Sequence, residues 1–313
     1  MRNNWIKQLV VVPIFLALSA CPASNNEIAS AADAAPATIE IAQIPEDPDP
    51  AIWVIKDEDT TIYLFGTVHI LKPGLSWFDE AVKDAFDASD ELVVEMIDPD
   101  PAEMVKIVNE LAIDQTGKSV RDKLQAEDRE KYEAALMKLG LPVASFDPLE
   151  LWFASVNISL VPLMANGYDS ASGVEKDLTA LAKSREMKIV GLETPRQQLG
   201  FFDNLPEDAQ IRFLNFTIET VDEMVDGMNN MVARWALADT DALAELMNAG
   251  LEDKILYDTL LANRNANWAE WVEDRMSKPG TVFLAVGAGH LAGESSLQEL
   301  LSEKGLNAEQ IEY

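Results

Sequence analysis

The sequence is poor in cysteine, histidine and positive charge. Its single cysteine, Cys21, excludes an internal disulfide and any zinc site built from several cysteines. Only 24 basic residues stand against 54 acidic ones, which gives a formal net charge of -30. Because so acidic a chain is repelled by a phosphate backbone, we expect no nucleic acid among its partners. The acidic residues are scattered along predicted helices, and this distribution is typical of a solvated surface.

The sequence also lacks a glycine-rich phosphate loop and a long apolar run. The apolar run near the N-terminus, residues 9–20, falls short of the roughly 20 residues that a membrane-spanning helix needs. It follows two basic residues and ends in Leu18-Ser19-Ala20-Cys21, which resembles the lipobox of bacterial lipoproteins. We therefore expect residues 1–20 to be a signal peptide and Cys21 to be lipidated. The alternative is an ordinary secretory signal, cleaved after a small residue, with Cys21 incidental.

Residues 21–50 are rich in alanine, serine, asparagine, aspartate and proline and have little apolar periodicity. Such a composition is typical of a flexible tether, here between the lipid and a folded domain over residues 51–313. Pro22 stands where an aspartate would resemble an inner-membrane retention signal. We therefore expect a membrane-anchored lipoprotein on the periplasmic face, with the outer membrane favoured.

Apolar patterns predict strands and helices in alternation at both ends of this domain. Strands are expected over 51–55, 62–65, 92–94, 188–192, 281–286 and 308–313, and helices over 77–88, 126–139, 148–164, 173–184 and 295–304. Two further segments, 206–250 with a break near Asp239 and 251–276, are expected to be helical. The pattern predicts an α/β sheet with a large helical insertion in the middle of the chain.

Side chains of the kind that bind metals follow four of the predicted strands. His69 and His290 each close a Gly-x-x-His segment, and they are the only histidines of the chain. Glu95 and Glu193 each follow a further apolar strand. If these strands are parallel neighbours, the four side chains converge at the edge where open α/β sheets bind ligands. Two imidazoles and a carboxylate, with one position left for water, are typical of a catalytic divalent metal.

Each member of this set also has a structural interpretation. A lone histidine after a strand is more often a hydrogen-bonded structural residue than a ligand. Glu95 could form a salt bridge with an arginine such as Arg264. The joint pattern favours the metal site, because both histidines of the chain and two strand-ending carboxylates take part in it.

The segments 62–70 (Ile-Tyr-Leu-Phe-Gly-Thr-Val-His-Ile) and 92–95 (Leu-Val-Val-Glu) resemble the start of the TraB/PrgY/GumN family. Later segments are similar to its further blocks: 173–178, 191–194 with Gln197 and Gln198, Arg264-Asn265 with Trp268, and 287–293. The resemblance covers roughly residues 50–313. Two positions depart from the family pattern: Glu175 stands where an aspartate is frequent, and Ser295 where a glycine often follows.

The resemblance extends to the TIKI proteins, which are membrane-tethered, metal-dependent proteases. More widely, it extends to the erythromycin-esterase and ChaN-like group, whose fold is a mixed sheet flanked by helices. It implies three metal-site residues and three more that line the same pocket: His69, Glu95 and His290, then Glu193, Arg264 and Asn265.

The expected function is metal-dependent hydrolysis of a peptide or of a small-molecule ester. Manganese, cobalt and zinc all suit such ligands, and the metal would activate a bound water molecule. Glu193 would act as general base, and Arg264 would hold a substrate carboxylate, stabilise the oxyanion or pair with a site acid. The alternative function is a non-catalytic lipoprotein that binds a metal, haem or a small ligand.

Overall fold

The structure, a computed structural model, describes residues 43–249 and 253–313. The predicted signal peptide, the predicted lipidation site Cys21 and most of the predicted tether lie outside the described residues. One six-stranded sheet, with strand order β4-β3-β5-β2-β1-β6, forms the centre of the domain. Its strands are β1 (Ile52–Lys56), β2 (Thr60–Thr67), β3 (Glu91–Met96), β4 (Lys188–Glu193), β5 (Gly280–Gly287) and β6 (Glu309–Gln310).

The four strands β4, β3, β5 and β2 are parallel, and β1 and β6 pair antiparallel at the other edge. The expected mixed sheet is therefore confirmed. Helices cover both faces of it: α1 (Glu80–Asp87) and α6 (Val174–Ser184) pack on one, and α12 (Asn263–Met276) and α13 (Leu297–Glu303) on the other. Because both faces are covered, the central strands are buried along nearly their whole length.

Along β5, successive side chains alternate between the two faces of the sheet and so belong to two different hydrophobic cores. Phe283 and Ala285 belong to the core on the α1 and α6 side, whereas Val282 and Leu284 belong to the core under α12 and α13. Successive side chains of a strand point to opposite faces, so a continuous apolar run supplies both cores at once.

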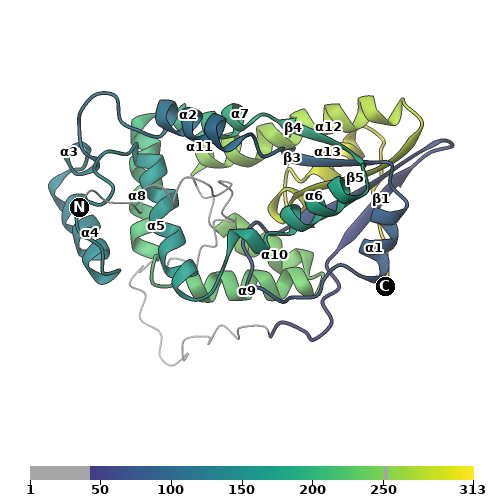
Figure 1. Cartoon of the computed structure of the whole chain (residues 1–313), viewed down its shortest axis with the longest axis horizontal. Coiled ribbons are helices and arrows are strands. Elements are labelled where there is room, and N and C mark those ends of the chain that lie inside the picture. Colours follow the sequence, from purple (N-terminus) through teal and green to yellow (C-terminus); the bar gives the residue numbers. More distant parts are fainter. Residues whose placement is uncertain (1–42, 250–252) are drawn as a thin grey trace, which may run out of the picture.

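The remaining helices gather largely at the end of the molecule away from the sheet (Figure 1). They are α2 (Pro101–Leu111), α3 (Val120–Lys123), α4 (Ala126–Lys138), α5 (Leu151–Ala165), α7 (Pro195–Asp203), α8 (Glu207–Thr220), α9 (Met224–Ala236), α10 (Thr240–Ala249) and α11 (Lys254–Tyr257). Shorter turns are η2 (Ser170–Ser172), the π-helix η3 (Asp258–Ala262) and the 3-10 helix η4 (Ala288–Leu291). The helical insertion is real, but β4 divides it into two stretches.

Several element boundaries differ from the sequence-based expectations. Helices α2, α3 and α7 were not predicted. The first predicted helix begins at Glu80, later than expected, and the last strand is only two residues long. The expected helix over 206–250 is three helices; the break near Asp239 was predicted and the one at 221–223 was not. The segment 251–276 begins with a short helix and a π-helix before α12.

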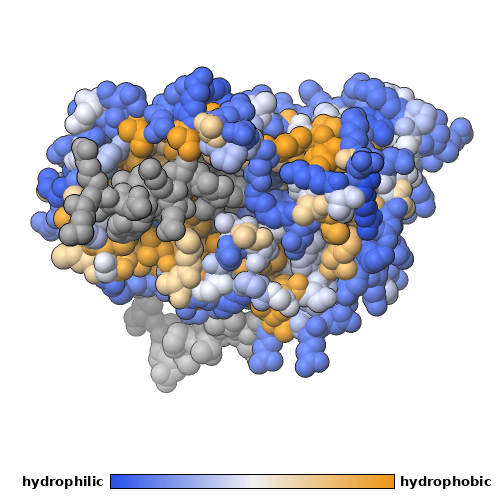
Figure 2. Space-filling view, in the orientation of Figure 1, coloured by the Kyte–Doolittle hydropathy of each residue, from blue (hydrophilic) through white to orange (hydrophobic). Residues whose placement is uncertain are grey.

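The last residues of the predicted tether already contact the domain. The amide of Asp49 donates to the carbonyl of Ala236 at 2.9 Å, and the Tyr313 hydroxyl donates to the carbonyl of Pro50 at 2.7 Å. Within residues 43–249 and 253–313, no helix is long and apolar enough to cross a membrane. Hydrophilic residues dominate the face shown in Figure 2, as the charge of the chain leads one to expect.

Candidate functional site

The four parallel strands bring their predicted site residues to one edge of the sheet. Thr67, the last residue of β2, is in register with Gly287, the last residue of β5, and each is followed by its histidine within three residues. Glu95 lies near the end of β3 and Glu193 ends β4. The convergence that was predicted from the sequence therefore exists in the fold.

The three predicted metal-site side chains surround a small hollow at Gly287. A Cβ atom placed on Gly287 would lie 3.1 Å from Glu95 Oε1, 3.1 Å from His69 Nε2 and 3.6 Å from His290 Cδ2. Glu95 Oε1 and His290 Nε2 are 3.8 Å apart. The missing side chain of Gly287 thus keeps open a space that all three residues face.

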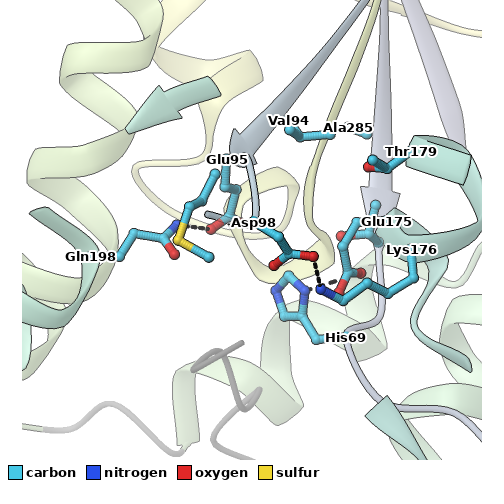
Figure 3. Close-up of a pocket in the computed structure, with 11 residues that line it drawn as sticks. His69, Val94, Glu95, Asp98, Glu175, Lys176, Thr179, Gln198 and Ala285 are labelled. Atoms are coloured by element: carbon cyan, nitrogen blue, oxygen red, sulfur yellow. Dashed lines mark hydrogen bonds and ion pairs between the residues drawn. The ribbon is translucent and has the colours of Figure 1, made fainter. Parts of the chain in front are cut away.

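A pocket opens beside this hollow, between the ends of β2 and β3 and the start of α6 (Figure 3). Its polar lining consists of Thr67, His69, Glu95, Asp98, Glu175, Lys176, Thr179 and Gln198. Lys176 pairs with Asp98, so this ion pair joins the first turn of α6 to the loop after β3. His69 and Glu95 therefore both line this pocket.

Glu175, a residue of the family block that was given no role, holds His69. Its Oε2 lies 3.2 Å from His69 Nδ1, and both side chains are mostly buried. Burial lowers the pKa of His69, but the charge of Glu175, its contact with the ring and the charge of Glu95 together outweigh that effect and leave the pKa raised. Since Nδ1 faces a carboxylate, it carries a proton, and Nε2 is the nitrogen that faces Glu95 and the hollow.

Glu95 is a buried carboxylate held in its ionised form. Oε1 accepts the backbone N–H of Gly287 at 2.7 Å. Oε2 accepts from Arg264 at 2.7 Å and from Gln198 at 3.1 Å. Burial would raise the pKa of Glu95, but the charge of Arg264 and these donors lower it to about 2. Glu95 is therefore negatively charged at neutral pH.

Arg264 is fully buried and connects both site glutamates. Its guanidinium binds Glu193 through two hydrogen bonds of 2.8 and 2.9 Å and also donates to Glu95. The Trp268 indole N–H donates to Glu193 at 3.1 Å, and the ring lies beneath the guanidinium at 4.6 Å. Neither Arg264 nor Glu193 lines the pocket described above. Of the roles expected for Arg264, the pairing with site acids is the one observed.

His290 has a defined tautomer. Asn265 Nδ2 donates to the carbonyl of Ser295 at 2.8 Å, so Asn265 Oδ1 is the acceptor for His290 Nδ1 at 2.6 Å. His290 Nε2 consequently bears a lone pair, and Arg264 Nη1 lies 2.9 Å from it. Burial and the charge of Arg264 lower the pKa of His290 to about 3, so the ring is neutral at neutral pH. Asn265 is a residue that orients His290 and does not reach the pocket.

The chemistry of these donors fits a divalent cation. Both histidines have Nδ1 tied to an acceptor and Nε2 turned toward Glu95, which is the usual arrangement of metal-binding histidines. One contact competes, because a cation at His290 Nε2 would displace Arg264 Nη1. Over the described part of the chain, no three histidine, cysteine or acidic side chains already stand in a metal-binding arrangement. The metal assignment stays a prediction.

Ser295, where the sequence resemblance leads one to expect a glycine, has a backbone conformation that suits glycine. Ser295 adopts a φ of 55°, in the left-handed region that favours glycine. Its carbonyl, which Asn265 binds, connects this strained turn to His290. A glycine would adopt the same conformation without strain.

Comparison with known proteins gives distant relatives that cover most of the domain. The chain is 22% identical over 269 residues to an uncharacterized protein of Treponema pallidum (strain Nichols), covering 81% of this chain and 80% of the relative. It is 21% identical over 252 residues to the uncharacterized protein YbaP of Escherichia coli (strain K12), covering 80% of this chain and 92% of the relative. No solved structure matches the chain significantly. The TraB/PrgY/gumN family model matches residues 51–310, and the chain therefore belongs to the TraB/PrgY/gumN family.

Proposed function

We propose that this protein is a hydrolase of peptides or small esters, with a divalent cation held by His69, Glu95 and His290. The observation that carries the proposal is the hollow at Gly287, which these three side chains surround. A hard or borderline cation would find there the neutral imidazole of His290, Nε2 of His69 and the ionised carboxylate of Glu95. When bound, it would lower the pKa of a water molecule in the pocket and polarise a substrate carbonyl.

The surrounding residues have separate tasks in this proposal. Gln198 and the Gly287 amide orient Glu95, and Arg264 keeps it ionised. Glu193 balances the charge of Arg264, since both its oxygens accept hydrogen bonds from the guanidinium and Trp268 adds a third. These contacts leave Glu193 poorly placed to take a proton from water.

We assign the general base to Glu175 in place of Glu193. Glu175 lines the pocket, and Glu193 does not. During hydrolysis the oxygen of water would attack the substrate carbonyl carbon, and its proton would pass to the carboxylate of Glu175. Glu175 would then return that proton to the amine or alcohol that leaves when the C–N or C–O bond breaks. The contact with His69 Nδ1 fixes the position of this carboxylate at the pocket wall.

Metal analysis combined with an activity assay tests the proposal. We expect the full chain, purified in detergent, to bind about one equivalent of manganese, cobalt or zinc and to cleave peptides or esters from a fluorogenic panel. A chelator should abolish cleavage, and added metal should restore it. His290→Ala should lose both metal and activity, whereas Glu110→Gln, which alters an exposed pair with Arg196, should keep both. Cleavage that survives complete metal removal would contradict the proposal that hydrolysis depends on a metal. Metal binding without turnover would favour the alternative function, a non-catalytic lipoprotein that binds a metal or a small ligand.

Anchoring to the membrane is a separate part of the proposal, and it depends on attachment of a lipid to Cys21. Its support is the short apolar run that ends at the only cysteine of the chain. We expect Cys21→Ser to move the protein from the membrane fraction to the soluble fraction after cell lysis and ultracentrifugation, because the lipid can no longer be attached. Ser19→Thr, a conservative change before the cleavage site, serves as the control and should stay in the membrane fraction. Retention of the Cys21→Ser protein in washed membranes would contradict lipidation.

A further inference from the structure

Thr67 is the last residue of β2 and lies in the wall of the pocket. It is in register with Gly287 of the parallel neighbour β5. Ala285, two residues earlier on β5, also lines the pocket. Side chains two residues apart on a strand share a face, so Thr67 stands on the face of the sheet that meets α6 and the pocket.

The hydroxyl of Thr67 has no hydrogen-bond partner among the described residues. The residue is 2% exposed, and its Oγ1 is shielded from bulk solvent. A hydroxyl can donate one hydrogen bond and accept two, and burying it with none of these satisfied costs free energy. Buried polar atoms of this kind are uncommon in folded proteins and call for a specific explanation.

The other buried threonines of the described chain show that this is not a general property of the fold. Thr60 Oγ1 donates to the carbonyl of Lys278 at 3.0 Å, and Thr217 Oγ1 donates to the carbonyl of Phe213 at 2.9 Å. Both hydroxyls are satisfied by the backbone of the domain itself. Thr67 is the exception, and it is also the one of the three that lines the pocket.

We infer that the Thr67 hydroxyl hydrogen-bonds the water molecule that attacks the substrate and so orients it; this rests on the proposed hydrolase function. We place a water molecule here because Thr67 lines the same pocket as His69 and Glu95, whose Nε2 and Oε1 atoms surround Gly287. Thr67 acts as a positioning residue: it holds an oxygen lone pair toward the carbonyl carbon, while Glu175 takes the proton.

The test compares Thr67→Val with Thr67→Ser in the full-length, metal-loaded protein. Valine keeps the shape of threonine and removes the hydroxyl, so kcat should fall by about 10- to 100-fold while KM stays unchanged. Serine keeps the hydroxyl and should retain most of kcat. Metal content should equal that of the unmodified protein in both variants, and the urea midpoint of Thr67→Val should not fall, because the lost hydroxyl has no internal partner.

Thr217→Val is the matched control. It removes an equally buried hydroxyl that does have an internal partner and lies outside the pocket, so its kcat and KM should not change. An unchanged kcat in Thr67→Val would overturn the inference, as would a rise in KM alone or a serine variant as slow as the valine variant. An unmodified protein without hydrolytic activity would overturn the proposed function and the inference with it. An active protein that tolerates Thr67→Val overturns only the inference.

Discussion

Arg264→Met is expected to lower the free energy of unfolding by about 3 to 5 kcal/mol. Arg264 is fully buried and is the shared partner of Glu95 and Glu193, whose side chains are 6% and 7% exposed. Methionine fills much of the same volume but leaves two buried carboxylates without a counter-charge. Urea unfolding followed by circular dichroism measures the loss. Arg196→Met removes an exposed partner of Glu110 and should change stability by less than about 1 kcal/mol.

The pH dependence of stability distinguishes lost charge pairing from lost packing. In the unmodified protein the pKa of Glu95 is lowered from 4.5 to about 2, so its stabilising effect is complete above pH 4.5 and disappears as pH falls through 2. Without Arg264, burial raises the carboxylate pKa, and the folded state then binds protons more tightly than the unfolded chain. Arg264→Met should therefore gain stability, relative to the unmodified protein, as pH falls from 7 to 5. Adding Glu193→Gln should recover part of the loss. A constant deficit across this range would contradict the charge argument.

Gly287→Ala is expected to reduce hydrolysis by at least about 100-fold and to weaken metal binding. The backbone of Gly287, at φ -50° and ψ 135°, accommodates alanine without strain. The added methyl group would instead enter the hollow, 3.1 Å from both Glu95 Oε1 and His69 Nε2. Overpacking of this kind costs about 1 to 3 kcal/mol in stability, which urea unfolding would measure beside metal content and activity.

Gly200→Ala is the control for Gly287→Ala. Gly200 lies within α7, and a Cβ there would meet only Asn204 Nδ2 at 3.4 Å, an ordinary contact. Helical alanine in place of glycine should raise stability by about 0.5 to 1 kcal/mol and leave activity unchanged. If Gly287→Ala retained full activity and a full equivalent of metal, the three side chains around Gly287 would not form the site.

The strands and their final residues could be predicted from the sequence because the information is local. The apolar runs before His69, Glu95, Glu193 and His290 are short, lack helical periodicity and end in residues of unusual type for a core. Helices α2 and α7 were missed because their apolar faces are short. Their starts are nevertheless marked, since Asp100 and Thr194 each cap a helix whose first residue is proline.

The internal pairing of the site could not be predicted, because it depends on contacts between distant segments. Glu175 follows His69 by 106 residues in the chain and reaches it only because α6 packs beside β3. In the same way, nothing near Arg264 in the sequence distinguishes a residue that faces substrate from one that binds two carboxylates. Its fully buried position, set by α12 packing under the sheet, decides between them.

The strand order determines how late in folding the pocket can form. β5 is the fifth of six strands in the chain, yet it lies between β3 and β2 in the sheet. Until residues 280–287 emerge, β2 and β3 have no native neighbour in common, and Glu95 lacks the Gly287 amide. The long sequence separation makes this closure a slow, late step in folding. A chain that is still being synthesised therefore has no assembled pocket, because Ala285 and the Gly287 amide are supplied by β5.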